Sequence, residues 1–246
     1  MQRKTKIVCT IGPASESYQM IEKLARAGMD VARLNFSHGT YDEHAARIAS
    51  VRQASSALGR PLAVLQDLPG PKIRTGKLQS EKVWLQDGER ITLTTETILG
   101  DEHRVSVTLS TLPGDVRPGD SIFVNDGTIR LEVLSTTSTE ILCTIAAGGV
   151  LTQMKGINVP GVKLSTQAVT DQDLRHLAFG LDHGIDFVAL SFITCAADIK
   201  RAKDFIASRG AGIPVIAKIE RREALNNIDE LIAAADGIMV ARGDLG

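Results

Sequence analysis

Residues 213–220 read IPVIAKIE and residues 238–246 read IMVARGDLG, and these two stretches decide the fold class. Each begins as an apolar run and ends in charge. The first delivers Lys218 and Glu220, and the second delivers Asp244. Positions two apart in a β-strand share a face, so Lys218 and Glu220 are predicted to point the same way. A cation and carboxylates at the carboxyl ends of successive parallel strands are typical of a barrel active site.

Short apolar runs recur along the chain and predict a parallel sheet. They are rich in Val and Ile and lack strict alternation, which suits strands buried on both faces. The predicted strands are Ile7–Ile11, Val31–Phe36, Leu62–Leu65, Phe187–Phe192, Ile213–Ile219 and Gly237–Ala241. Apolar residues at helical spacing predict helices over Ser17–Ala27, Tyr41–Leu58, Asp171–Leu181 and Asp198–Ser208. Because strands and helices alternate, the predicted class is α/β.

One interval, from about residue 70 to residue 163, breaks this alternation. It contains short strands and tight turns, and Asp87-Gly88 and Asp126-Gly127 are typical β-hairpin turn sequences. We therefore expect residues 70–163 to form a small β-rich lid domain inserted between the two parts of the α/β domain, residues 1–69 and 164–246. These two parts hold six predicted strands, whereas a closed (β/α)8 barrel of about 250 residues has eight.

The composition is that of an ordinary globular chain. The 246 residues carry 28 basic and 29 acidic side chains, and the apolar share is 43%. The net charge of −1 gives no support to nucleic-acid or membrane-surface binding. The three cysteines form no zinc or disulfide pattern, and no stretch is long and apolar enough for a secretory signal or a membrane span. We expect a cytoplasmic protein.

Three polar residues alternate along residues 31–39, which read VARLNFSHG. Arg33, Asn35 and Ser37 would share one face of a strand, where burial without partners is costly. One interpretation is a strand end whose polar side meets solvent. The other is a phosphate-binding arginine beside oxygen ligands for a cation.

A second polar stretch follows the third predicted strand. Residues 65–76 read LQDLPGPKIRTG and place Asp67 at the strand end, with Lys72 and Arg74 in the turn beyond. The stretch is not a P-loop, because Leu78 stands where Ser or Thr must hold magnesium. It is either an ordinary strand-exit turn at the boundary of the insertion or part of a functional site.

Lys218 lies among apolar residues and needs a partner if it is buried. A structural ion pair with Glu220 or Asp244 would supply one, and Asp244 could instead cap a following helix. Alternatively, Glu220 and Asp244 are hard oxygen ligands suited to Mg²⁺ or Mn²⁺, which commonly bind one or two carboxylates plus substrate oxygens. Gly243 would let backbone N–H groups approach an anion at a helix start.

Seven separated blocks carry a family resemblance. In chain order they are KIVCTIGPAS (6–15), VARLNFSHG (31–39), GPKIRTG (70–76), KGINVPG (155–161), LSFI (190–193), AKIE (217–220) and IMVARGDLG (238–246). Together they closely resemble pyruvate kinase across the whole chain. The resemblance implies a TIM (β/α)8 barrel interrupted after its third strand by an inserted small β-barrel domain. It also implies phosphoryl transfer from phosphoenolpyruvate to ADP, giving pyruvate and ATP in the last step of glycolysis.

The resemblance also implies roles for individual residues. Lys218 would stabilise charge on the transferring phosphoryl group, and Arg33 would bind the same phosphate. The backbone of Gly243 and Asp244 would receive the substrate carboxylate, while Glu220 and Asp244 would hold Mg²⁺ or Mn²⁺. The implied monovalent-cation site comprises Asn35, Ser37, Asp67 and the Leu68 carbonyl. The implied nucleotide contacts are Asn35, His38, Arg74 and Lys155.

Lys72 departs from the family pattern. Potassium-dependent members carry glutamate at this position, and the Lys72 ammonium would place a fixed positive charge where K⁺ otherwise sits. We therefore expect K⁺ to be dispensable. Leu68 departs as well, since many members have threonine there, but the implied ligand is a backbone carbonyl.

The chain stops at Gly246, whereas family members continue through two further barrel units and a C-terminal domain. We therefore expect an incomplete barrel and an activity impaired by truncation. One alternative is a non-catalytic fragment or binding module that retains the metal and phosphate groups. Another is a Mg-dependent barrel aldolase or lyase acting through an enolate. Full-length family members are homotetramers, but the sequence does not specify the oligomer or the effector of this chain.

Overall fold

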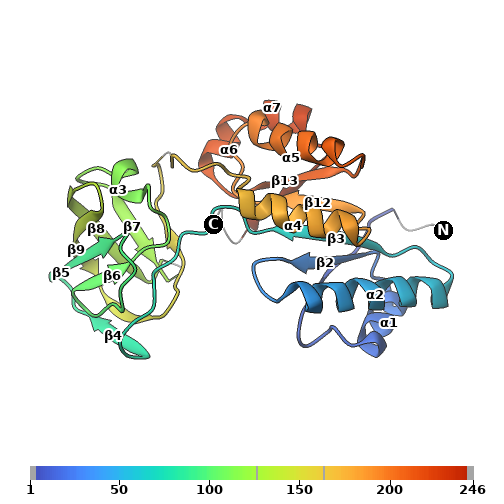
Figure 1. Cartoon of the computed structure of the whole chain (residues 1–246), viewed down its shortest axis with the longest axis horizontal. Coiled ribbons are helices and arrows are strands. Elements are labelled where there is room, and N and C mark those ends of the chain that lie inside the picture. The colour runs from blue at the N-terminus through green and yellow to red at the C-terminus, as the bar shows by residue number, and fades with distance from the viewer. Residues whose placement is uncertain (1–3, 126, 163, 243–246) are drawn as a thin grey trace. The chain divides into compact units, whose positions relative to one another are not determined.

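The computed structural model describes residues 4–125, 127–162 and 164–242, and the chain divides into two compact units (Figure 1). The first unit comprises Met1–Pro71 and Gln167–Gly246, and the second comprises Lys72–Thr166. Each unit has a hydrophobic core of its own, which is the usual property of a domain.

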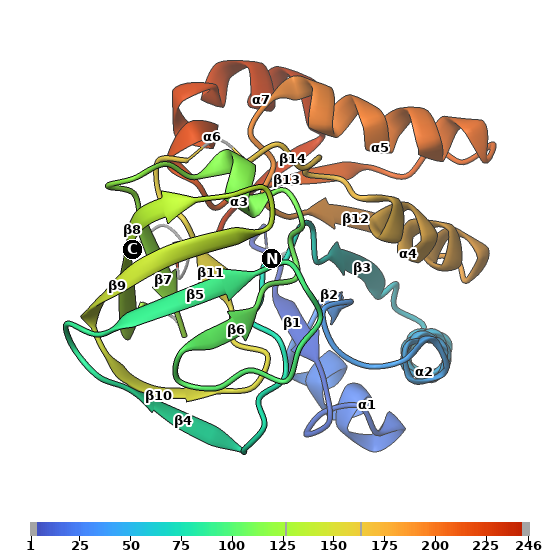
Figure 2. The ribbon, with the colours of Figure 1, turned by 60° about the vertical axis from the view of Figure 1, so that its left-hand side comes forward.

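The first unit is built on a six-stranded parallel sheet. Its strands lie side by side in chain order (Figure 2), as in consecutive (β/α) units of a barrel. β3 and β12 are neighbours, with Leu65 opposite Phe187, although the second unit separates them in sequence. The strands are β1 (Val8–Ile11), β2 (Val31–Asn35), β3 (Ala63–Leu68), β12 (Phe187–Leu190), β13 (Val215–Ile219) and β14 (Gly237–Val240).

The helices of the first unit are α1 (Tyr18–Ala27), α2 (Tyr41–Leu58), α4 (Asp171–Asp182), α5 (Ala196–Ser208), α6 (Arg222–Asn226) and α7 (Ile228–Ala234). The first four match the four predicted helices to within two residues at each end. Capping residues explain their starts, since Thr40 and Thr170 each form a capping box with the acidic residue three positions later. α6 and α7 were not predicted, because helices of 5 and 7 residues are too short to show a periodic pattern. None of the helices among the described residues is long and apolar enough to cross a membrane.

Each long helix buries one face against the sheet. Ile21 of α1, Val51 of α2, Leu177 of α4 and Ile199 of α5 belong to the same core cluster as the strand residue Val64. All five are inaccessible to solvent. This burial fixes the strands from outside, so that their carboxyl ends form a rigid edge.

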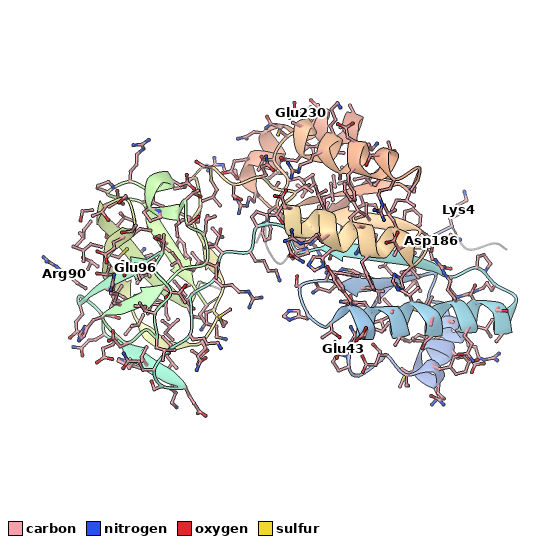
Figure 3. All side chains as sticks on the ribbon, in the orientation of Figure 1. Lys4, Glu43, Arg90, Glu96, Asp186 and Glu230 are labelled. Atoms are coloured by element: carbon pink, nitrogen blue, oxygen red, sulfur yellow. The ribbon has the colours of Figure 1, made fainter. Side chains whose placement is uncertain are left out.

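Three aspartates repeat one arrangement at the amino ends of the strands. Asp30, Asp186 and Asp236 each stand directly before a strand, namely β2, β12 and β14. Each carboxylate accepts a backbone N–H at the start of the preceding strand in the sheet: that of Ile7, Val64 or Val215, at 2.6–2.8 Å. Asp186 is labelled in Figure 3. We call these residues the amino-end aspartates.

The second unit is a β structure with one short helix. One sheet has the order β11-β7-β8-β9-β5-β6, and β4 and β10 form a separate two-stranded ribbon. Its elements are β4 (Lys82–Leu85), β5 (Arg90–Thr94), β6 (Arg104–Ser106), α3 (Leu112–Asp115), β7 (Ser121–Val124), β8 (Ile129–Thr136), β9 (Glu140–Ala147), β10 (Gly149–Thr152) and β11 (Ile157–Asn158).

The two predicted hairpins of this unit had different outcomes. β7 and β8 pair antiparallel with Val124 opposite Ile129, which agrees with the second prediction, although Asp126 itself lies outside the described residues. The Asp87-Gly88 hairpin prediction was wrong, because β4 pairs with β10 and β5 pairs with β9 and β6. The reason is tertiary: the Asp87 carboxylate accepts the N–H of Gly148 at 2.6 Å, which ties the turn to the β9–β10 connection.

Candidate active site at the carboxyl ends of the strands

Five polar side chains from neighbouring strands meet at the carboxyl edge of the first unit's sheet. Arg33 lies on β2, Asp67 on β3 and Lys218 on β13, while Ser191 and Glu220 directly follow β12 and β13. We call these five residues the carboxyl-end cluster. Two cations face two carboxylates, so the charges of the cluster balance.

Lys218 is the centre of this cluster. Its side chain is 10% exposed, and its ammonium lies 2.6 Å from Glu220 Oε1 and 3.3 Å from Asp67 Oδ1. The ammonium also donates a hydrogen bond to Ser191 Oγ at 2.8 Å. Three acceptors therefore compensate the loss of hydration that burial of a charge entails. The predicted ion pair between Lys218 and Glu220 is present.

Arg33 is held at the side of the cluster. Its Nε donates to Asp67 Oδ2 at 2.7 Å, and its Nη1 donates to Thr10 Oγ1 at 2.7 Å. The Asp67 side chain is 2% exposed and that of Arg33 is 24% exposed. The guanidinium is thus fixed at its inner side and still reaches solvent. Guanidinium groups with free donors are well suited to bind phosphate oxygens.

Glu220 is buried with both of its carboxylate oxygens in contacts. Oε1 faces Lys218, and Oε2 accepts the backbone N–H of Phe192 at 2.7 Å. Phe192 has a φ of 58°, a left-handed conformation that is uncommon for a residue other than glycine. Such backbone geometry is concentrated at functional sites.

Glu220 fits one half of the expected divalent-metal site. Its carboxylate is a hard oxygen ligand, and Mg²⁺ commonly takes one or two such ligands together with substrate oxygens. The other expected ligand, Asp244, and the neighbouring Gly243 lie outside the described residues. Across the residues that the structure describes, no group of three or more His, Cys, Asp or Glu side chains could hold a metal by itself.

The residues expected to bind a monovalent cation lie at the ends of two adjacent strands. Asn35 of β2 is opposite Asp67 of β3 in the register, and Leu68 is the last residue of β3. Asn35 Oδ1 accepts the backbone N–H of Ser37 at 3.0 Å, which closes a turn directly after β2. Lys72, expected to replace K⁺, belongs to the second unit.

The residues expected to bind nucleotide divide between the two units. Asn35 and His38 belong to the first unit, while Arg74 and Lys155 belong to the second. Arg74 and Lys155 lie on facing backbone segments, since the N–H of Thr75 donates to the Lys155 carbonyl at 2.8 Å. The Arg74 guanidinium donates to the Met154 carbonyl at 3.0 Å.

His44 supports the turn that carries His38. Its Nε2 lies 2.9 Å from the His38 carbonyl, and its ring stacks on Phe36 with 3.9 Å between the centroids. Burial lowers the pKa of His44, which favours the neutral form of the imidazole. The stack fixes the segment between β2 and α2.

Sequence reasoning missed two side chains of this site, Ser191 and Thr10. Both are small hydroxyl residues near strand ends, where a serine or threonine is equally compatible with an ordinary turn. A signal was present for Ser191, because it directly follows the buried run Phe187–Leu190, as Glu220 follows Val215–Ile219.

Sequential parallel strands with a buried charged cluster at their carboxyl ends define a protein of the α/β-barrel class. A family model described as "Pyruvate kinase, barrel domain" matches residues 2–246. The chain therefore belongs to the pyruvate kinase family, and the match confirms both the recognised family and the predicted α/β-barrel fold class.

Curated relatives named pyruvate kinase agree with this assignment. The chain is 48% identical over 244 residues to the protein of Thermotoga maritima, which covers 99% of this chain and 52% of the relative. It is 46% identical over 243 residues to that of Thermococcus litoralis, with 99% and 51% covered. It is 47% identical over 249 residues to that of Geobacillus stearothermophilus, with 100% and 42% covered. The chain thus spans about half the length of the curated relatives it matches.

Proposed function

We propose that the chain carries the phosphoryl-transfer centre of a pyruvate kinase, which acts on phosphoenolpyruvate and ADP and yields pyruvate and ATP. The observation that carries the proposal is the buried ammonium of Lys218, held 2.6 Å from Glu220 and 3.3 Å from Asp67 at the carboxyl edge of the sheet. The non-catalytic and lyase alternatives are not favoured, because the matched relatives are named pyruvate kinase.

The charges of the cluster suit this reaction. Phosphoryl transfer requires positioning and neutralisation of charge more than covalent chemistry. Lys218 would supply a fixed positive charge for the transferring phosphoryl group. Arg33, whose guanidinium is held by Asp67 and Thr10 and is partly exposed, would bind the oxygens of the same phosphate.

A divalent ion, Mg²⁺ or Mn²⁺, would be held by Glu220 and Asp244. When bound, it would act as a Lewis acid that neutralises charge on the substrate oxygens. The backbone of Gly243 and Asp244 would receive the carboxylate of phosphoenolpyruvate. Arg74 and Lys155 would contact the nucleotide phosphates, together with Asn35 and His38. We also propose a cytoplasmic location, which the free cysteines Cys9, Cys143 and Cys195 support.

The direct test is an assay coupled to lactate dehydrogenase, performed on the purified chain with phosphoenolpyruvate and ADP. Lys218→Ala should lower turnover by about 10²- to 10³-fold, because one preorganised positive charge is lost. Lys200→Ala is the matched control, since Lys200 is 73% exposed on α5 and forms an ion pair with Asp204 of the same helix. Equal turnover of Lys218→Ala and wild type would contradict the proposal. Cleavage of 2-oxo acids without ATP formation would favour the lyase alternative.

The proposed monovalent-cation site comprises Asn35, Ser37, Asp67 and the Leu68 carbonyl, with Lys72 in place of K⁺. We expect equal turnover with K⁺ and with a large organic cation as the only monovalent ion. Lys72→Glu should create a dependence on K⁺, because the fixed positive charge is replaced by a carboxylate that needs one. Strict K⁺ dependence of the wild type would contradict this part of the proposal and leave the phosphoryl-transfer assignment intact.

A further inference from the structure

We propose that Ser191 is a positioning residue that holds the ammonium of Lys218 in place; this inference rests on the function proposed above. Ser191 follows β12 directly and is 5% exposed. Its hydroxyl lies 2.8 Å from Lys218 Nζ and 3.4 Å from Asp67 Oδ1. It is the only neutral side chain of the carboxyl-end cluster as the described residues define it.

Only one assignment of donors and acceptors fits the contacts of the Ser191 hydroxyl. An ammonium only donates, so the Ser191 oxygen accepts from Lys218. The hydroxyl hydrogen is then directed to the Asp67 carboxylate, which only accepts. Ser191 therefore connects Lys218 to Asp67, and through Asp67 to Arg33. The two cations expected to face the phosphoryl group are joined in one network.

The neutral acceptor Ser191 acts on the Lys218 ammonium in a different way from the two carboxylates. Glu220 and Asp67 stabilise Lys218 by opposing its charge. Ser191 restrains the direction of the ammonium without adding a third negative charge beside it. The lysine side chain has a flexible four-carbon stem, and its position has to be imposed by such contacts.

The backbone that carries Ser191 is itself held tightly. Phe192 adopts φ 58° and donates its N–H to Glu220, and the Arg221 guanidinium lies 5.1 Å from the centre of the Phe192 ring. On the other side, a Cβ at Gly70 would come within 2.9 Å of the Ser191 carbonyl, so only glycine permits this approach. Because its backbone is held in this way, the Ser191 hydroxyl has a fixed position from which it accepts the hydrogen bond of Lys218.

The test measures the reactivity of Lys218 directly, without use of the proposed activity. The purified chain is labelled with trinitrobenzenesulfonate at fixed pH, and the rate at Lys218 is followed by peptide mass spectrometry relative to exposed Lys200. Ser191→Ala should raise the relative rate roughly tenfold, the change expected when a charged group loses one hydrogen bond. Ser191→Thr keeps the hydroxyl and should restore the wild-type rate. Ser106→Ala is the matched control, because Ser106 is a buried, hydrogen-bonded serine of the second unit.

Kinetics provide the second readout. Ser191→Ala should lower kcat about tenfold or more and change the KM for phosphoenolpyruvate less than threefold, with recovery in Ser191→Thr. Equal labelling of Lys218 in wild type and Ser191→Ala would overturn the inference, as would a rise in KM at unchanged kcat. If the wild type forms no ATP, the proposed function fails, whereas the labelling still decides whether Ser191 restrains Lys218.

Discussion

The two ends of the parallel sheet use acidic residues in opposite ways. At the amino end, Asp186 and Asp236 have side chains that are 40% and 43% exposed, and each satisfies a backbone N–H of the neighbouring strand. At the carboxyl end, Asp67 and Glu220 are each 2% exposed and face cations that are largely buried. Carboxylate side chains are therefore partly exposed at the amino end of the sheet and buried at the carboxyl end.

The amino-end aspartates and the carboxyl-end cluster differ in what they contribute to the stability of the fold. A half-exposed carboxylate that accepts a backbone N–H stabilises the sheet at little desolvation cost. Buried ion pairs cost several kcal/mol of desolvation for each ion and are often no more stable than apolar residues in their place. Burial of the carboxyl-end cluster therefore adds little to stability, which agrees with the catalytic role that we propose for it.

The second unit supports this interpretation. Its buried polar side chains among the described residues are Thr75, Thr94 and Ser106, and all three are uncharged. Its ion pairs lie at the surface instead, where Arg104 contacts Glu96 and Glu140 (Figure 3 labels Glu96). The buried charged side chains among the described residues thus all belong to the first unit: Asp67, Lys218 and Glu220 lie in the carboxyl-end cluster, and Arg47 and Asp173 lie on α2 and α4.

The largest effect is expected from a substitution that disrupts the carboxyl-end cluster. Lys218→Met keeps an unbranched side chain, one atom shorter, but removes the ammonium. Glu220 loses the cation that faces it, whereas Asp67 keeps Arg33, and the free energy of unfolding of the first unit should fall by about 3 kcal/mol. Hydrogen exchange of β3 and β13 peptides, followed by mass spectrometry, measures the loss. Peptides of β8 and β9 in the second unit serve as an internal control.

Adding Glu220→Gln to Lys218→Met sharpens this prediction. The double variant removes one uncompensated charge and should recover part of the lost stability. A loss below about 1 kcal/mol in Lys218→Met would show that the cluster is hydrated enough to tolerate Glu220 without a cation, and the contrast between the two ends of the sheet would disappear.

The next effect concerns the amino end. Asp186→Ala removes the acceptor of the buried Val64 N–H and the partner of Arg52, and should lower the free energy of unfolding by about 1–2 kcal/mol. Turnover per folded molecule should not change, because Asp186 is at the edge opposite to the cluster. Urea unfolding followed by circular dichroism and the coupled assay provide the two measurements. Asp186→Asn keeps a side-chain oxygen for Val64 and should lose less, and a fall in turnover with unchanged stability would reverse our assignment.

Several of these features were predictable from short-range patterns. The period of two in a strand placed Lys218 and Glu220 on one face, and they form an ion pair at 2.6 Å. Apolar runs predicted the strands, and apolar residues at helical spacing predicted the four long helices. Such signals depend on neighbours in sequence, which is why they could be read directly.

Other features depend on contacts between distant residues. The Ser191 hydroxyl became part of the cluster only because β12 lies between β3 and β13, bringing residues 67, 191 and 218 together. The failed hairpin at Asp87-Gly88 has the same origin, since Gly148 lies 61 residues from Asp87. The amino-end aspartates were not predicted either, because an aspartate before a strand resembles any turn residue.

The smallest expected effect is the contribution of the Asp236 charge to the free energy of unfolding, which should depend on pH. The N–H of Val215, and then the Lys203 ammonium, lower the pKa of Asp236 below its ordinary value of 3.8. A depressed carboxyl pKa stabilises the folded state above the unfolded-state pKa, and this contribution is lost as pH falls through the folded-state pKa. Because Asp236 is 43% exposed, its charge should contribute less than about 1 kcal/mol.

Asp236→Asn isolates that charge, since the amide oxygen can still accept the N–H of Val215. Wild type should therefore be slightly more stable than the variant near pH 7, and the two should converge as the pH falls from the ordinary value of 3.8 through the lower folded-state pKa of Asp236. Urea midpoints measured between pH 3 and pH 7 follow the convergence, with Lys203→Met as the variant that removes only the partner cation. A difference between wild type and Asp236→Asn that shows no dependence on pH across this range would mean that the carboxylate acts through its shape and not its charge. In that case the amino-end aspartates are hydrogen-bond acceptors alone, and the contrast with the buried, charge-bearing carboxyl end becomes sharper.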